Sequence, residues 1–337
     1  MNGYKIIVDP ERIDKQQWSD FVFNHPYGNA FQTPEMYEVY QKTPLYDPIF
    51  IAVTENDQLL GILLALVQKE YPNPFGFISS RSIIWGGPLV MDNDLKLIEI
   101  ILNEYDKIAK KKAIYSQFRN FWEQTDEKKI FEKFSYSYEE HLNILVDLSK
   151  SIEDLWKAID SRKRTYINQA EKKGLKFIVD TEYTFLNDCY SILKSTYKKA
   201  KLPLPGLDFF KNLINFSDLI SLVPFIVKFE SKVISCFIGL CFKGKVYEFY
   251  VGFDSDYSKK NPGDLLLWKI FIWAKQNGFT LFDFGGAGKP NVPYGVRDYK
   301  KKFGGEMVEF GRYEKIHHPI WMNIAKTGFK IWQRVKF

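Results

Sequence analysis

Hydrophobic positions along this chain alternate between the spacing of strands and the spacing of helices. In the first half, two apolar runs flank a polar turn, a segment with apolar residues three and four positions apart follows, and a short apolar run closes the series. These segments are Ile49–Thr54, Leu59–Gln68, Asp94–Lys112 and Ala113–Phe118. Asp94 is a residue type suited to cap the helix. The pattern predicts a β-hairpin, a helix and a further strand.

The second half repeats this order. Its predicted elements are strands 225–229, 233–242 and 245–253, a helix over 264–276 and a strand over 279–284. Leu59-Leu60 corresponds to Val233-Ile234 at an offset of 174 residues. One long offset favours two copies of an α/β unit over a solenoid, whose repeats span about 20–50 residues. A chance recurrence of common elements is the alternative.

The repeated order of elements predicts an α/β (α+β) protein with two tandem domains. Their join is expected near Asp147–Ser151, where Ser151 suits the N-cap of a helix that begins with acidic residues. We expect a first domain of residues 1–150, completed by residues 312–337, and a second domain of residues 151–311.

The C-terminal segment has its own pattern. Residues 316–337 combine lysines and an arginine with Trp321, Ile324, Phe329 and Trp332 at helical spacing. We expect a helix that returns to pack on the first domain, and the alternative is a helix that lies on a membrane surface.

Composition narrows the class of protein. The 337 residues are 45% hydrophobic and 26% charged, with a net charge of +6, which fits a globular protein and leaves phosphate-bearing partners open. No apolar run approaches the ~20 residues of a membrane-spanning helix. Four histidines and three cysteines without C-x-x-C or HExxH spacing predict no metal site. With no apolar signal region at its start, the chain is expected to be a reduced, cytoplasmic protein.

Several motifs then point to a family. They are HPYGNAFQ at residues 25–32, the basic stretch at 161–175, YVG at 250–252, NPGDLL at 261–266, FDFGG at 282–286 and YKKKFGG at 299–305. Over roughly residues 20 to 320 the chain resembles the FemABX family, tRNA-dependent transferases that build peptidoglycan side bridges. The resemblance implies two tandem domains of the acetyltransferase-like (GNAT) fold, with most of the active cleft in the second domain.

Lys300 is the strongest candidate for a catalytic residue. The resemblance implies that it approaches the reacting acyl group or an acceptor phosphate, where a cation would stabilise a developing oxyanion. Lys300 and Phe303 would share a helical face that the two intervening lysines do not, although a solvated charge run is the alternative. Candidate proton acceptors are Asp283 and Tyr250. Replacing Lys300 with Met is expected to lower turnover at least about tenfold and to leave stability unchanged.

Further residues are candidates for substrate binding. They are Arg162, Arg164, Tyr166, Gly285, Gly286, Tyr294, Arg297 and Phe303. The basic stretch would contact phosphates of a tRNA acceptor end or of a nucleotide-linked sugar, with a plain exposed helix as the alternative. The glycine pair ends a strand where the backbone either turns or approaches a ligand.

The sequence also bears on the donor. GNAT proteins that use acetyl-CoA usually carry a Q/R-x-x-G-x-G/A loop whose amides bind the pyrophosphate at a helix start. The corresponding loop, 258–264, lacks this pattern and places Asp264 where the anion would sit. We expect no tightly bound cofactor and aminoacyl-tRNA as donor, with acyl-CoA as the alternative.

Three hypotheses for function follow. The first is transfer of an aminoacyl or acyl group to an amine of a peptidoglycan or other cell-envelope precursor, nucleotide- or lipid-linked. The resemblance implies an arginine and a tyrosine that hold the standard precursor, and residues 202–209 lack them. Unless Lys199 or Lys201 substitutes, the acceptor is expected to differ from that precursor. The second is acyl-CoA-dependent N-acylation of an amino sugar, and the third is a non-catalytic glycan-precursor binding protein. No DNA partner is expected, and a peripheral contact with the inner face of the membrane stays open.

Overall fold

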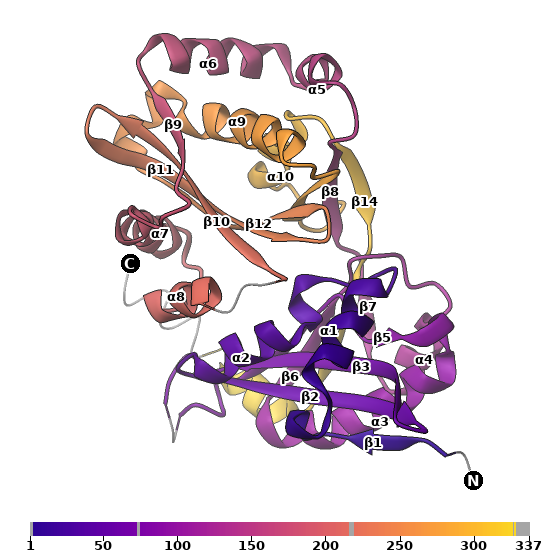
Figure 1. The fold of residues 1–337 in the computed structure, drawn as a ribbon. Helices are drawn as coiled ribbons and strands as arrows, with labels where there is room; N and C mark the ends of the chain where they lie inside the picture. The colour runs from indigo at the N-terminus through magenta and orange to yellow at the C-terminus, as the bar shows by residue number, and fades with distance from the viewer. Residues whose placement is uncertain (1–2, 73–74, 216–218, 326, 328–337) are drawn as a thin grey trace. The chain divides into compact units, whose positions relative to one another are not determined.

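The chain divides into two compact units, each built around its own sheet (Figure 1). The computed structural model describes residues 3–72, 75–215, 219–325 and 327. The first unit comprises Met1–Glu140 with Phe310–Phe337, and the second comprises His141–Glu309.

The first unit is a mixed sheet with helices on both faces. Its strands are β1 (Lys5–Ile7), β2 (Tyr46–Glu55), β3 (Gln58–Gln68), β4 (Arg81–Trp85), β5 (Leu89–Val90), β6 (Tyr115–Arg119), β7 (Ser137–Glu139) and β15 (Arg312–Ile316). Its helices are α1 (Lys15–Asn24), α2 (Pro34–Lys42), α3 (Leu95–Lys112) and α4 (Lys128–Lys133), with 3-10 helices η1 (Pro10–Arg12), η2 (Ala30–Gln32) and η3 (Met91–Asn93). The strands are ordered β1-β2-β3-β4-β6-β15-β7, and β5 also pairs with β3. Within this sheet only the pair β4–β6 is parallel among the described residues.

Helix α3 buries its apolar stripe on one face of that sheet, while α1 and α2 cover the other face (Figure 1). Asp94 caps α3 by accepting a hydrogen bond from the backbone of Lys96, as the sequence predicts. The predicted hairpin is also present as β2 and β3.

The second unit is also a mixed sheet with helices on both of its faces. Its strands are β8 (Leu142–Asp147), β9 (Lys176–Val179), β10 (Ser221–Phe229), β11 (Lys232–Phe242), β12 (Lys245–Phe253), β13 (Leu281–Gly286) and β14 (Glu306–Glu309). Its helices are α5 (Ile152–Ala158), α6 (Ser161–Lys172), α7 (Leu186–Ala200), α8 (Leu207–Asn215), α9 (Pro262–Gln276) and α10 (Gly295–Lys301), with η4 (Ser255–Lys260). The strand order is β14-β8-β13-β12-β11-β10-β9. Helix α9 packs on one face, α6 lies outside α9, and α7 and α8 cover the opposite face (Figure 1).

The register of the two hairpins supports the internal duplication. In the first unit, Leu60 is the extra residue of β3, because Val53 pairs with Gly61 and the next residue of β2 pairs with Leu59. In the second unit, Ile234 is the extra residue of β11 in the same position of its hairpin. The offset between the two bulges is 234 − 60 = 174 residues, the offset found in the sequence. A bulge bends and twists a strand, so both hairpins are bent at the same place.

The second unit begins ten residues before the predicted join. Strand β8 pairs antiparallel with β13 and β14, so it belongs to the second sheet. The predicted N-cap at Ser151 is present, but it starts α5 inside the second unit. A single apolar strand carries no signal that tells which sheet it joins.

The segment that returns to the first unit starts as a strand, β15, which was not predicted and which precedes the helix expected over residues 316–337. Strand β15 inserts between β6 and β7, and the ring of Tyr313 stacks on Phe131 with centroids 4.0 Å apart. Residues 319–325 are helical, while Phe329 and Trp332 lie outside the described residues. Strand β15 has five residues and buries one large side chain. An apolar pattern this short does not distinguish a strand from a helix.

Candidate active site

The two parallel strands of the second sheet separate along their length. Strands β12 and β13 pair only from Lys245–Leu281 to Tyr247–Asp283. Beyond that point β12 continues to Phe253 and β13 to Gly286. Backbone groups that face each other there are not joined by a ladder, so the sheet has an opening at the carboxyl ends of its two parallel strands. In open α/β sheets this is the end at which ligands bind.

The corresponding strands of the first unit do not separate. Strands β4 and β6 pair along all five residues, from Arg81–Tyr115 to Trp85–Arg119, and the backbone N–H of Gly86 extends the pairing to Arg119. The two copies therefore differ at the place where a ligand could enter, and the opening belongs to the second unit.

Two local distortions open the second sheet. In β12, Ile238 of β11 pairs with Tyr250 while its neighbour Gly239 pairs with Glu248, which leaves Phe249 as an extra residue. In β13, Gly285 adopts a φ of +65°, a conformation that glycine takes without steric cost. The side chain of Asp283 accepts a hydrogen bond of 2.6 Å from the backbone N–H of Gly285 and holds this turn.

Lys300 reaches into this opening and contacts both strands. Its Nζ donates a hydrogen bond of 2.5 Å to the backbone oxygen of Phe284 on β13, and it lies 2.8 Å from Oε1 of Glu248 on β12. The side chain of Lys300 is 8% exposed and that of Glu248 is 11% exposed. The following two residues of the lysine run are exposed, so Lys300 alone points inward. An ammonium in this position is a charged hydrogen-bond donor between two diverging strands.

The residues around Lys300 hold its helix in place. Phe303 is 1% exposed and packs in the core of the second unit, where it anchors the end of α10 rather than facing a substrate. Gly305 follows with a φ of +99°, and a Cβ there would lie 2.7 Å from the backbone oxygen of Leu145 on β8. Arg297 donates hydrogen bonds to the backbone oxygens of Lys289 and Val292, so it organises the loop between β13 and α10.

Asp283 lies on the face of β13 that is turned away from α9, since its neighbours Phe282 and Phe284 pack in the α9 core. Burial raises the pKa of its carboxyl group to about 6, against the opposing effects of the Gly285 N–H and of Lys245 and Lys300. A carboxylate with a pKa near neutrality can both accept and release a proton at physiological pH.

Tyr250 sits in an aromatic cluster beside the opening. Its ring centroid is 5.1 Å from Phe210, 5.6 Å from Tyr197 and 4.7 Å from Phe249. Burial, followed by the charge of Glu248, raises the pKa of Tyr197 well above its usual value. The cluster forms an apolar wall of α7, α8 and β12 on the face opposite α9.

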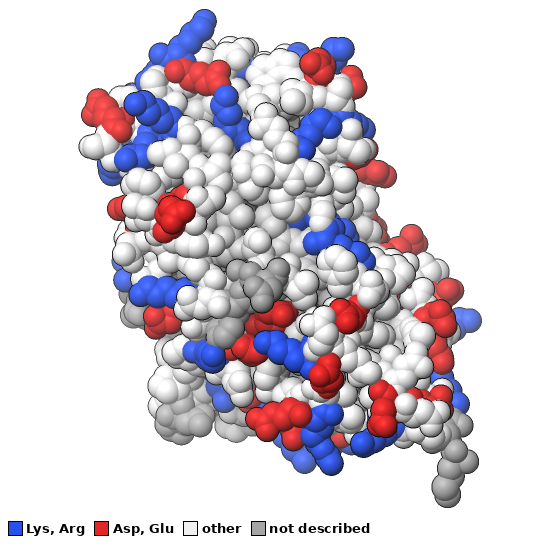
Figure 2. Space-filling model, in the orientation of Figure 1, with Lys and Arg blue, Asp and Glu red and all other residues white. Residues whose placement is uncertain are grey.

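The basic residues predicted on α6 have separate surroundings. Arg162 is exposed, whereas Arg164 donates hydrogen bonds of 3.4 Å to the backbone oxygens of Trp156 and Lys157. Tyr166 is partly buried. On the drawn face of the second unit, lysines and arginines are interspersed with acidic residues (Figure 2). Of the remaining candidates, Gly286 and Tyr294 are exposed.

Sequence reasoning missed two residues of the second unit. Glu248 was not singled out, although a carboxylate inside an otherwise apolar strand is the signal that would have indicated it. Lys163 was treated as one of a basic run, yet its Nζ lies 2.7 Å from Oδ1 of the buried Asp264. Asp264 is at the start of α9, as predicted, but its charge is paired there.

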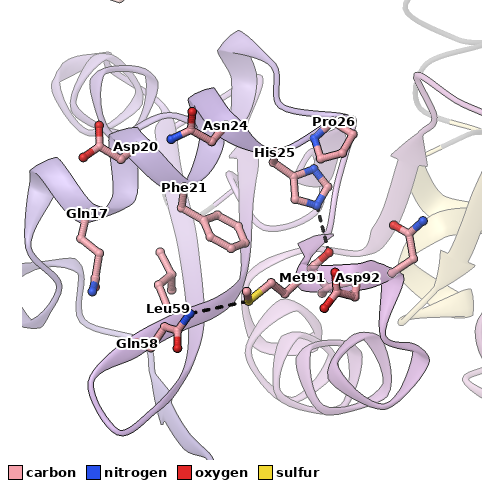
Figure 3. A pocket seen from close by; sticks show the side chains of 12 residues that line it. Gln17, Asp20, Phe21, Asn24, His25, Pro26, Gln58, Leu59, Met91 and Asp92 are labelled. Carbon is pink, nitrogen blue, oxygen red and sulfur yellow. Dashed lines mark hydrogen bonds between the residues drawn. The ribbon is translucent and has the colours of Figure 1, made fainter.

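The motif at residues 25–32 has a structural role in the first unit. His25 lines a hollow of about 470 Å³ together with Phe21, Gln58, Met91 and other residues (Figure 3). Both ring nitrogens of His25 are engaged, because Nδ1 accepts from the backbone N–H of Tyr27 and Nε2 lies 2.9 Å from the backbone oxygen of Val90. No lysine or arginine lines this hollow, so it lacks a cation for an anionic donor.

Known proteins share this architecture. Residues 161–301 match a family described as an acetyltransferase (GNAT) domain. The fold is similar to that of FemX, with a TM-score of 0.72 and 16% sequence identity, covering 95% of this chain and 100% of that chain. It is also similar to a tandem GNAT protein from the clavulanic acid biosynthesis pathway, with a TM-score of 0.60 and 9% identity over 94% of this chain and 99% of that one. This chain has a FemABX-like tandem GNAT fold.

A third similar structure is L-PGS, a lysyl-phosphatidylglycerol synthetase, from Bacillus licheniformis, with a TM-score of 0.59 and 16% identity over 93% of this chain and 96% of that one. No curated protein matches the chain by sequence. The GNAT family match and the tandem GNAT fold support an acyltransferase. Among the described residues, no helix combines the length and apolar character needed to cross a bilayer.

Proposed function

We propose that this protein transfers an aminoacyl group from aminoacyl-tRNA to an amine of a peptidoglycan or other cell-envelope precursor. The observation that carries the proposal is the ammonium of Lys300 in the opening between β12 and β13. Its contacts with Phe284 and Glu248 use two of its three N–H bonds. The third is then available to the oxygen of a carbonyl group that becomes an oxyanion.

The reaction needs few groups from the protein. The acceptor amine attacks the ester carbonyl carbon, a C–N bond forms, and the ester C–O bond breaks. The ribose oxygen leaves and takes up the proton that the amine loses, so that it becomes a hydroxyl group. Lys300 would stabilise the oxyanion, and Asp283 is the candidate that takes the proton of the amine, because its pKa of about 6 suits this role. The remainder of the rate would come from holding amine and ester together.

The start of α9 favours tRNA over acyl-CoA as the donor. A helix start binds the pyrophosphate of CoA through free N–H groups and a positive dipole end. Here the buried side chain of Asp264 lies in the first turn of α9, where that anion would sit, and Lys163 and Tyr299 hold its carboxylate in place. An aminoacyl-tRNA donor would place the reaction in the cytoplasm, and the similarity to FemX and to L-PGS supports a cell-envelope precursor or a lipid-linked molecule as the acceptor.

The second candidate is an acyl-CoA-dependent N-acyltransferase on an amino sugar of a surface polysaccharide. The family match favours it, because the matched family is described as an acetyltransferase domain. Both candidates use the same opening and the same lysine, and they differ in the donor and in the acceptor amine.

Label transfer separates these candidates. The purified protein would be incubated with a cell-envelope precursor extract and either a mixture of radiolabelled aminoacyl-tRNAs or labelled acetyl-CoA. Label that moves from tRNA supports the proposal and names the amino acid, whereas label that moves from CoA supports the second candidate. The Lys300→Met variant is run in parallel to exclude transfer by a contaminant. Micromolar binding of a precursor without transfer from any donor would contradict both and indicate a binding protein.

A further inference from the structure

Side chains from two helices of the second unit meet at a carboxylate on a third helix. Nζ of Lys163 on α6 lies 2.7 Å from Oδ1 of Asp264 on α9, and the hydroxyl of Tyr299 on α10 donates a hydrogen bond of 2.9 Å to the same oxygen. The ammonium of Lys163 also lies 4.3 Å from the centroid of the Tyr299 ring. We name these residues the Lys163–Asp264–Tyr299 network.

Burial makes the members of this network dependent on one another. The side chain of Lys163 is 12% exposed and that of Asp264 is 6% exposed. A charge buried to this extent is costly when its partner is removed, and a cation over an aromatic face gains further attraction. Burial and the Asp264 carboxylate keep the pKa of Tyr299 well above its usual value, so its hydroxyl remains a donor.

The network can orient Lys300 because Tyr299 and Lys300 lie on the same short helix, α10. This helix has seven residues, too few to be stable without contacts to the rest of the unit. Tyr299 directly precedes Lys300, and successive side chains of a helix point about 100° apart. When the hydroxyl of Tyr299 is fixed at α9, the side chain of Lys300 is directed to the strands.

We propose that the Lys163–Asp264–Tyr299 network positions Lys300 between β12 and β13, an inference that rests on the proposed role of Lys300 in transfer. The three residues are positioning residues, because they would act through Lys300 and not on the reacting atoms. They fix the angle of α10 around its axis, and Lys300 meets the backbone oxygen of Phe284 and the carboxylate of Glu248 only at that angle.

The first test measures the position of Lys300 without any activity. The intact protein would be treated with a limiting amount of an amine-acylating reagent, and labelling of Lys300 relative to Lys301 would be measured by mass spectrometry. In Tyr299→Phe and in Lys163→Met, relative labelling of Lys300 should rise about fivefold, the change in population that the loss of one hydrogen bond allows. Tyr299→Phe keeps the ring and the Lys163–Asp264 pair, so it is informative even where a charge-removing variant does not fold.

The chain offers a matched control for the same helix pair. Lys269 on α9 forms an ion pair of 2.7 Å with Glu171 on α6, and neither residue belongs to α10. Lys269→Met should leave the labelling of Lys300 unchanged. An equal rise in Lys269→Met would show that docking of α6 on α9 is what matters and would overturn the proposal. Unchanged labelling in all variants would also overturn it.

The second test uses label transfer by the full chain. In Tyr299→Phe, kcat should fall by up to about twofold while KM stays near its original value, because the acceptor and donor contacts are intact and a fivefold larger displaced population still leaves Lys300 in place in part of the molecules. A rise in KM with unchanged kcat would contradict a role in positioning Lys300. Where the wild type shows no transfer but the labelling result holds, the proposed function fails and the network stands as an account of α10.

Discussion

Lys300 and Glu248 form a buried ion pair, so a substitution at either residue changes stability as well as activity. Removal of one partner leaves the other as an unpaired charge inside the protein, which typically costs about 3–5 kcal/mol. The stability of Lys300→Met is therefore expected to fall, in contrast to the expectation from sequence that it would be unchanged. The loss reflects the 11% exposed carboxylate of Glu248 and not the lost amine itself.

A double variant separates catalysis from stability at this pair. Lys300→Met/Glu248→Gln removes both charges, so it should regain most of the stability that Lys300→Met loses. Transfer should stay at least about tenfold below the wild type in both variants, because neither has a cation at the opening. Urea unfolding gives the free energies, and label transfer gives the activity. If the double variant regained transfer along with stability, the catalytic role of Lys300 would be rejected.

Asp283 makes a pH-dependent contribution to stability. Its pKa is raised from an ordinary value of 3.8 to about 6, so the folded protein favours the protonated carboxyl group. This stabilisation is fully present below the ordinary pKa and is lost as the pH rises through 6. Asp283→Asn cannot ionise and should gain stability relative to the wild type between pH 4 and pH 7, by up to ~3 kcal/mol for a difference of about two pH units.

The measurement is urea unfolding of both proteins at several pH values across that range. Asparagine retains an oxygen that can accept from the N–H of Gly285, so the turn of β13 is kept. A difference between the two proteins that does not change with pH would mean that Asp283 ionises in the folded protein as it does in water, and its role as a proton acceptor near neutral pH would lose its basis.

At the scale of elements, Gln32 replaces part of a β-ladder in the first unit. Strand β3 pairs with β4 and β5 but not at Leu64 in between. The buried amide of Gln32 fills this place: it donates to the backbone oxygens of Leu64 and Trp85 at 3.0 and 2.9 Å and accepts from the N–H of Leu64 at 2.8 Å. Gln32→Met would leave three backbone groups, two of them buried, without these partners, and we expect a loss of ~3 kcal/mol in the free energy of unfolding.

The control for this prediction is Gln16→Met on the exposed side of α1, which should change stability by less than about 0.5 kcal/mol. Chemical unfolding followed by circular dichroism compares the two. A loss for Gln32→Met no larger than that of the control would show that the interrupted ladder is held by other contacts.

The elements that sequence predicts well are those with long apolar patterns. Both hairpins, α3 and α9 are long and rich in apolar residues, and β12 runs from Lys245 to Phe253 as predicted. Strand β15 was missed because only one of its five residues is buried. Strand β8 was placed in the first domain because the sequence of a single strand does not indicate which strands it pairs with. Periodicity reports which side of an element is buried, not which sheet receives it.

The candidate site shows the same limit more strongly. Lys300 was singled out by its motif, and the shared face with Phe303 predicts the inward direction that both residues have. Glu248 lies 52 residues away from Lys300 in the chain, and Lys163 lies 101 residues from Asp264. No local pattern relates residues at such separations. The opening itself arises from an extra residue in β12 and a left-handed glycine in β13, which are properties of paired strands.

At the scale of the whole molecule, the two copies of the α/β unit differ in how their two parallel strands pair. They share the hairpin bulge at an offset of 174 residues, yet the parallel pair is closed over five residues in the first copy and open after three residues in the second. A closed parallel pair satisfies its backbone groups internally and has no place for a ligand, whereas an open one leaves groups to be satisfied by a substrate. Within the part of the chain that the structure describes, only the second copy combines the opening with a buried cation.

Hydrogen exchange of the full chain tests this division of roles. Without ligand, amides at the ends of β12 and β13 should exchange faster than those of β4 and β6, because a missing ladder leaves them less protected. A donor that binds between β12 and β13 should slow exchange in peptides that cover Glu248–Phe253 and Phe284–Gly286 and leave peptides of β4 and β6 unchanged. Mass spectrometry with and without aminoacyl-tRNA, and with and without acetyl-CoA, gives the comparison. Slowing confined to β4 and β6 would place the donor on the first unit and remove the reason for assigning catalysis to Lys300.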